Sequence, residues 1–197
     1  MTAPDAARRS GRRRLLAVAS IFIVPLAAAA ILYYSVGWRP AVDAHGTLID
    51  PPRPFDVAGL TRSDGRPAAA EDFLGRWSLV HPIRAACSER NLAILDELAR
   101  VRLALDKDAG RVQRVLVHGG DCEAIEPPSR AADLLVLAAP GAAGDAFLRQ
   151  FPPAVDGAAG IYIVDPQGNL MMSYPASGSA RGLLKDLERL LRLSSIG

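Results

Sequence analysis

The segment from Trp77 to Leu105 places the strongest restriction on the fold of this chain. It begins with a short apolar run that ends at Val80, continues through a His-Pro break to a thiol at Cys87, and then becomes amphipathic. Its apolar residues recur at helical spacing: Leu92, Leu95, Leu98, Val101 and Leu105. The segment predicts a strand that delivers a cysteine to the first turn of a helix, where the partial positive charge of the helix N-terminus favours the thiolate.

The net positive charge of the chain comes from its N-terminal tail. The first 36 residues carry five arginines and a single acid, Asp5, whereas the remaining residues carry 18 basic and 20 acidic side chains. The body of the protein is therefore slightly acidic. This distribution argues against a nucleic-acid-binding surface, and we expect no nucleic-acid partner.

An uncharged run of 22 residues, Leu15 to Val36, follows the arginine cluster. As a helix it would extend roughly 33 Å, enough for a hydrocarbon core of about 30 Å. No small-x-small cleavage motif follows the run, so we expect an uncleaved anchor rather than a signal peptide. The preceding arginines predict a cytoplasmic N-terminus. We therefore expect a basic tail at residues 1–14, one transmembrane helix at 15–36 in a bacterial inner membrane, and a periplasmic C-terminal domain.

The residues after the anchor divide into a linker and a domain. Residues 37–54 are rich in proline and glycine and predict an extended tether. From residue 55 to residue 197 strands alternate with helices, which predicts an α/β domain with a mixed sheet. The expected elements are a turn at Asp64–Gly65, strands at 111–118 and 133–138, a helix at 144–150, a hairpin at 160–174 and a closing amphipathic helix at 179–193.

Several of these motifs together resemble the Sco family. The resemblance rests on Leu79-Val80, the step of eight residues to Cys87, the Leu95-Asp-Glu-Leu-Ala99 segment, and Ile161 to Pro166 followed by Gly168. It covers most of residues 46–197. The resemblance implies a thioredoxin-like mixed sheet flanked by helices, preceded by one N-terminal transmembrane helix. It also implies a role in the assembly of cytochrome oxidase, to which Sco proteins help deliver copper.

The copper site that the resemblance implies is degenerate in this sequence. The family uses a C-x-x-x-C pair and a distant histidine, and the corresponding positions here are Cys87, Asn91 and Gly157. Copper(I) prefers soft thiolate ligands, which an amide oxygen or a glycine cannot replace. We therefore expect copper binding much weaker than in an intact Sco protein, if there is any, and no other cofactor.

A different copper or redox site remains an alternative. His118 and Cys122 follow the strand after the Cys87 helix, and parallel strands of a β-α-β unit end at one edge of the sheet. A Cys87/Cys122/His118 site would suit copper(I), and Cys87 and Cys122 would lie close enough for a disulfide. In the plainer interpretation, His118 is a polar residue at a strand end and Cys122 is a loop thiol. His81 is expected to be structural, and no role is expected for His45.

Three functional hypotheses follow from the sequence. The first is a membrane-tethered accessory factor for oxidase assembly, which binds oxidase subunits or other assembly factors without turnover. The second is a thiol–disulfide oxidoreductase with Cys87 as redox thiol and Cys122 or an external thiol as resolving group. The third is a copper carrier that uses the Cys87/Cys122/His118 site.

Overall fold

The computed structural model describes residues 17–31, 34, 44–54, 56–84, 87–120, 122, 133–152 and 160–196. The chain forms two compact units, Met1–Asp43 and Ala44–Gly197. In the first unit, residues 17–31 are helical, and their apolar side chains, among them Ile21, Phe22 and Leu26, are exposed. Within the described part of the chain, no helix combines the length and the apolar character needed to cross a membrane. Part of the predicted span at 15–36, and the predicted tail at 1–14, lie outside the described residues.

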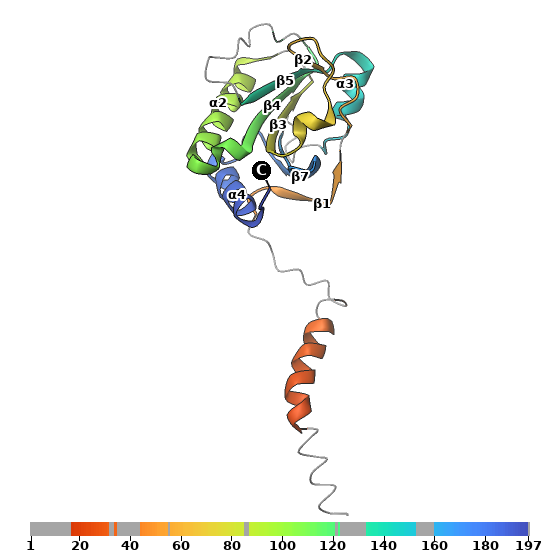
Figure 1. The fold of residues 1–197 in the computed structure, drawn as a ribbon, viewed down its shortest axis with the longest axis vertical. Coiled ribbons are helices and arrows are strands. Elements are labelled where there is room, and N and C mark those ends of the chain that lie inside the picture. Colours follow the sequence, from red (N-terminus) through yellow and green to blue (C-terminus); the bar gives the residue numbers. More distant parts are fainter. Residues whose placement is uncertain are drawn as a thin grey trace, which may run out of the picture. The chain divides into compact units, whose positions relative to one another are not determined.

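The second unit is a seven-stranded mixed sheet with helices on both faces (Figure 1). The strands follow the spatial order β1-β7-β6-β3-β4-β5-β2, in which β3, β4 and β5 are parallel and the other pairs are antiparallel. The strands are β1 (Thr47–Pro54), β2 (Thr61–Arg62), β3 (Trp77–Ile83), β4 (Val112–His118), β5 (Leu134–Ala138), β6 (Ile161–Val164) and β7 (Asn169–Tyr174). The helices are η1 (Ala70–Phe73), α2 (Glu89–Ala104), η2 (Asp106–Arg111), α3 (Gly141–Leu148) and α4 (Ala180–Leu193).

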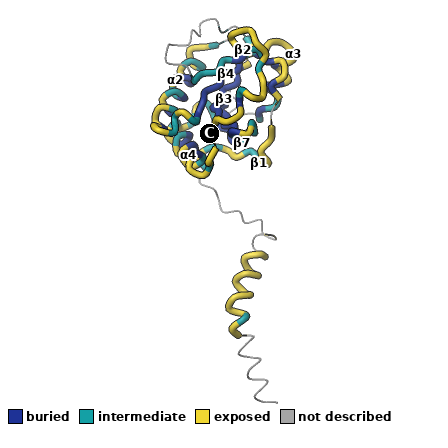
Figure 2. Tube along the Cα trace, in the orientation of Figure 1, coloured by how far each residue is buried: buried dark blue, intermediate teal, exposed yellow. Residues whose placement is uncertain are grey.

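Each face of the sheet has its own apolar core, because side chains alternate between the two faces along a strand. Trp77 and Leu79 of β3 pack with residues of α2 and α4, whereas Val80 packs with Phe147 of α3 on the opposite face. Figure 2 shows the buried residues concentrated in the central strands, with exposed residues on the outer sides of the helices. The predicted strands at 111–118 and 133–138, the hairpin and the closing helix are confirmed within one or two residues.

The structure differs from the sequence prediction at residues 44–54. We expected these residues to belong to a tether, but 47–54 form β1, which pairs with β7 at the edge of the sheet. The pairing is interrupted between Leu48 and Arg53. Pro51, Pro52 and Pro54 lack the amide hydrogen that a ladder requires, and such residues are tolerated only on an edge strand. The prolines therefore indicated a linker where the chain forms an irregular edge strand.

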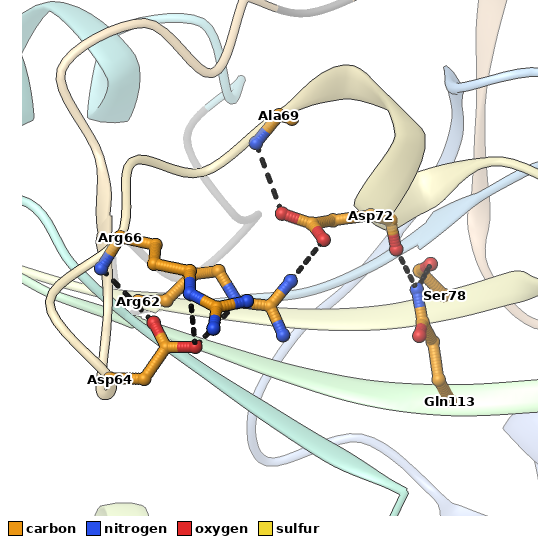
Figure 3. A network of polar contacts seen from close by, with 7 residues as sticks. All are labelled: Arg62, Asp64, Arg66, Ala69, Asp72, Ser78 and Gln113. Atoms are coloured by element: carbon orange, nitrogen blue, oxygen red, sulfur yellow. Dashed lines mark hydrogen bonds and ion pairs between the residues drawn. The ribbon is translucent and has the colours of Figure 1, made fainter.

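A polar network attaches the segment between β2 and β3 to the sheet (Figure 3). The Asp72 carboxylate accepts hydrogen bonds from the Arg62 guanidinium and from the Ala69 amide. The buried Gln113 amide donates to the Asp72 carbonyl at 2.7 Å and to the Ser78 hydroxyl at 2.9 Å. Ser78 and Gln113 lie near the first residues of β3 and β4, which are paired in register. The network therefore fixes the end of these strands that lies away from Cys87.

Candidate disulfide site

The structure joins Cys87 and Cys122 in a disulfide bond. Their Cα atoms are 5.1 Å apart, and the bond closes a separation of 35 residues. The Cα–Cα distance lies within the usual range for disulfides. The described part of the chain contains no free cysteine. The expected proximity of the two thiols is thus present, and their redox role remains a prediction.

The parallel pairing of β3 and β4 brings the two cysteines to one edge of the sheet. The two strands are in register from Trp77 opposite Val112 to Ile83 opposite His118, so they end together. Cys87 follows the end of β3 and Cys122 follows the end of β4. The disulfide therefore lies at the carboxyl ends of the central strands, as the β-α-β argument predicts.

Gly119 allows the loop after β4 to lie close to the end of β3. Its amide donates a hydrogen bond to the Ile83 carbonyl at 3.0 Å. A Cβ atom at Gly119 would lie 2.7 Å from the backbone carbonyl oxygen of Arg84, a separation that Cβ atoms essentially never show. Glycine is therefore required here by close approach of two backbones.

Cys87 lies immediately before the N-cap of α2. The Ser88 hydroxyl accepts a hydrogen bond from the backbone amide of Asn91, three residues further on, at 3.4 Å. This is the usual pairing of a serine N-cap. Once the disulfide is reduced, the partial positive charge of the helix N-terminus would favour the Cys87 thiolate. Both cysteines are half-buried and pack on a small apolar cluster formed by Ile83, Leu95 and Leu116.

Asn91 and His81 form a partly buried contact under the first turn of α2. The His81 side chain is fully buried, with Nδ1 3.1 Å from the Gly160 carbonyl oxygen and Nε2 3.3 Å from Oδ1 of the Asn91 side-chain amide. Burial lowers the pKa of His81, and the hydrogen bond to the Gly160 carbonyl offsets only part of that effect. His81 is thus structural in this state, as expected from the sequence. Gly157, the third family position, lies outside the described residues.

His118 is held by its own loop. It is half-buried at the end of β4, and Nδ1 lies within hydrogen-bond distance of the Gly120 carbonyl oxygen. Among the described residues, no three His, Cys, Asp or Glu side chains gather closely enough to hold a metal ion. In the oxidised protein both sulfur atoms are bonded to each other, so the Cys87/Cys122/His118 site offers copper(I) no thiolate. A copper ion would first require reduction of the disulfide.

Sequence reasoning missed Asp186, which fixes the start of the second unit. This carboxylate on α4 is 5% exposed, and Oδ2 accepts hydrogen bonds from the His45 amide at 2.8 Å, the Gly46 amide at 3.1 Å and the Tyr174 hydroxyl at 2.8 Å. Burial alone would raise the pKa of Asp186, but these hydrogen bonds together lower it. A signal was present in the sequence, because Asp186 lies three residues after Leu183 and next to Leu187 on the apolar face of the closing helix.

The cluster around Asp186 also brings His45 into contact with α4. His45 Nδ1 lies 3.4 Å from Asp186 Oδ1. Added Cβ atoms at Gly46 and Gly182 would overlap the Tyr174 ring and the His45 ring, respectively. The absence of side chains at both glycines therefore permits the close packing of this junction. His45, for which no role was expected, is one of the residues that attach the chain to α4.

Solved structures with the same fold include several Sco proteins. Yeast Sco1 superposes with a TM-score of 0.57 at 15% identity, covering 80% of this chain and 98% of its own. ScoI from Arabidopsis thaliana with copper bound gives a TM-score of 0.53 at 15% identity, covering 73% and 99%. BsSco, a member of the Sco family of cytochrome c oxidase assembly proteins in which a disulfide switch has been identified, gives 0.51 at 15%, covering 74% and 99%. At this level of identity, the comparison confirms the thioredoxin-like mixed sheet flanked by helices that the resemblance predicted, whereas the transmembrane helix remains a prediction.

Sequence comparisons give the family. No curated protein matches the chain significantly. The family described as "transmembrane-like, thioredoxin-like, C-terminal domain" matches residues 77–194, a range that includes both cysteines and extends from β3 to the end of α4. Since this range is more than half of the chain, the protein belongs to the family of transmembrane-like, thioredoxin-like C-terminal domains.

Proposed function

We propose that this protein is a Sco-like accessory factor for the assembly of a cytochrome c oxidase and that it acts without the usual copper site. The observation that carries the proposal is the thioredoxin-like mixed sheet shared with Sco proteins, in which Asn91 stands where the family resemblance places the second copper-binding cysteine. BsSco belongs to a family of oxidase assembly proteins, which supports the same class of client here. In this role the protein binds oxidase subunits or other assembly factors and needs no turnover.

The second candidate function is thiol–disulfide exchange, which the bond between the two cysteines favours. The thiolate of a partner protein would attack one sulfur, form a mixed disulfide with it and release the other as a thiolate. A second thiol of the partner would then attack the mixed disulfide. The partner leaves oxidised, and Cys87 and Cys122 remain as a dithiol that has accepted two electrons and two protons. The position of Cys87 before α2 assists its release, because the helix N-terminus stabilises the thiolate.

The residues at the family copper positions do not fit copper(I) as cargo. Asn91 supplies an amide instead of a thiolate, and its side chain is already in contact with His81. Copper bound to the ScoI of Arabidopsis thaliana therefore does not carry over to these positions. In a competition against a strong copper(I) chelator, the reduced protein should lose the ion. Stoichiometric copper that survives the competition, and is lost in Cys122→Ser, would establish the Cys87/Cys122/His118 site instead.

We further propose attachment to the bacterial inner membrane through residues 15–36, with the second unit in the periplasm. The support is the arginine cluster before an uncharged run and the exposed apolar side chains of the helix at 17–31. The periplasm is also a compartment in which disulfides persist. Alkaline phosphatase fused to the C-terminus should be active in cells, whereas a reporter that requires the cytoplasm should be inactive. The reverse pattern would refute this topology.

The function itself is tested by deletion and complementation. Deleting the gene should lower cytochrome c oxidase activity in membranes, and the wild-type gene and the exposed-surface control Ser195→Ala should restore it. Cys87→Ser/Cys122→Ser, provided that it accumulates in the membrane at the wild-type level, distinguishes the two candidates, because a factor that acts only by binding would still complement and a redox factor would not. Membranes of the deletion strain with full oxidase activity would refute the proposed role in oxidase assembly.

A further inference from the structure

The buried imidazole of His81 connects the start of α2 to the start of β6. His81 lies on β3, and its side chain shares a face of the sheet with Leu79 and Ile83, because residues two apart along a strand point the same way. It therefore lies between the apolar core under α2 and α4 and the small cluster beside the disulfide. One nitrogen reaches Gly160, the residue before β6, and the other reaches Asn91 in the first turn of α2.

The hydrogen-bond chemistry of this contact defines one tautomer. A carbonyl oxygen only accepts, so Nδ1 must carry the proton that is donated to Gly160. The imidazole is neutral because it is fully buried and has no carboxylate partner among the described residues, and Nε2 is then an acceptor. The Asn91 side chain must therefore turn its NH2 group toward Nε2, which requires only the exchange of its nearly equivalent amide atoms.

Asn91 is thereby held at two points. Its backbone amide donates to Ser88 and its side-chain amide donates to His81, so the turn from Cys87 to Asn91 is attached to both β3 and Gly160. Cys87 is the residue before the Ser88 cap. A displacement of this turn would move the Cys87 sulfur relative to Cys122, which is attached to the end of a different strand.

We propose that His81 is a positioning residue for the disulfide: through Asn91 it holds the start of α2 where Cys87 reaches Cys122, and so favours the disulfide over the dithiol. The hydrogen bonds of His81 add nothing to the sulfur chemistry itself. Their effect is to raise the effective concentration of one thiol at the other. The inference rests on the proposed thiol–disulfide role of the pair.

The test measures the equilibrium of the full-length protein, purified in detergent, with reduced and oxidised glutathione. Two glutathione thiols reduce the protein disulfide and leave as one glutathione disulfide, so the ratio of the two protein forms gives the equilibrium constant. Asn91→Leu removes the donor to His81 at similar side-chain size. His81→Asn keeps a donor for Gly160 but is too short to reach Asn91. Each variant should lower the constant for disulfide formation about tenfold, which corresponds to about 1.4 kcal/mol.

Gln113→Leu is the matched control. It removes a buried amide whose two hydrogen bonds, to Asp72 and Ser78, lie at the opposite end of β3 and β4 (Figure 3). It should destabilise the oxidised and the reduced protein equally and leave the equilibrium constant within about twofold of wild type. Urea unfolding of both redox forms provides the second measurement, in which Asn91→Leu should destabilise the oxidised form more than the reduced form.

Two outcomes are decisive. If Asn91→Leu and His81→Asn lower stability equally in both redox forms and leave the glutathione equilibrium unchanged, His81 has a merely structural role and the inference is overturned. If the equilibrium shifts as expected but Cys87→Ser/Cys122→Ser still restores oxidase activity, the positioning role stands and the proposed redox function fails.

Discussion

Loss of the Cys87–Cys122 bond should be the most damaging change to stability that leaves the apolar core intact. The bond closes a separation of 35 residues that includes all of α2 and β4. The loop-closure relation assigns a loop of that length about 4 kcal/mol at room temperature, through the conformational entropy that the cross-link removes from the unfolded chain. Because domains are stable by only about 5–15 kcal/mol, this is a large fraction of the total.

The assay is urea unfolding followed by far-ultraviolet circular dichroism, on the oxidised protein and on Cys87→Ser/Cys122→Ser. With a slope of roughly 2 kcal/mol per molar urea, a loss of about 4 kcal/mol lowers the midpoint by about 2 M. The single variants Cys87→Ser and Cys122→Ser should each lose nearly as much as the double variant, because one missing sulfur already abolishes the bond. Alkylation of the protein isolated from cells without reductant should label neither cysteine. Two alkylated thiols, or a double variant within about 1 kcal/mol of wild type, would refute the reasoning.

Three other predictions concern buried groups. Asp186→Asn should cost roughly 1–3 kcal/mol at pH 7, because it removes the charge of the shared acceptor and replaces one of its oxygens by an NH2 donor. Because the hydrogen bonds to the carboxylate lower its pKa, this difference should shrink as the pH falls below about 4, and a constant difference would contradict it. Burial lowers the pKa of His81, so as the pH falls the unfolded chain protonates this imidazole before the folded protein does. The free energy of unfolding should therefore fall below about pH 6.5, and by more in wild type than in His81→Asn. Parallel pH profiles of the two proteins would contradict this. Gly144→Ala should lower the thermal midpoint of unfolding, because the added Cβ would overlap the Ala139 carbonyl oxygen. Gly110→Ala should not lower it, because the space around Gly110 is open. Equal midpoints for the two variants would rule out the overlap.

The elements that the sequence predicted well have strong local signals. The hairpin that ends at Tyr174 has a turn rich in Asp, Pro and Gly between apolar runs, and α4 has a regular apolar face with a serine N-cap. The proximity of Cys87 and Cys122 followed from topology, since consecutive parallel strands of one sheet end at the same edge. These features depend on short segments or on a general rule of chain connection.

The features that the sequence did not predict depend on residues far apart in the chain. The contact between His45 and Asp186 spans 141 residues, and that between His81 and Gly160 spans 79. Neither partner has a local pattern that indicates the other. β1 was missed for a different reason, because its prolines are the residues that usually exclude a strand. Its place in the sheet comes from pairing with β7 at only four positions.

The contacts of Asp186 also determine how the second unit would bear a mechanical load. A chain anchored upstream of Ala44 transmits tension to the domain through His45 and Gly46, whose amides are bound to Asp186 before the first paired residue of β1. The force would therefore pass into α4 and the core beneath it. Without this carboxylate, the same tension would act on the first pair of the β1–β7 ladder and separate the strands one pair at a time. In a tethered chain, the buried acid would thus protect the weakly paired edge strand β1 from being pulled off the sheet.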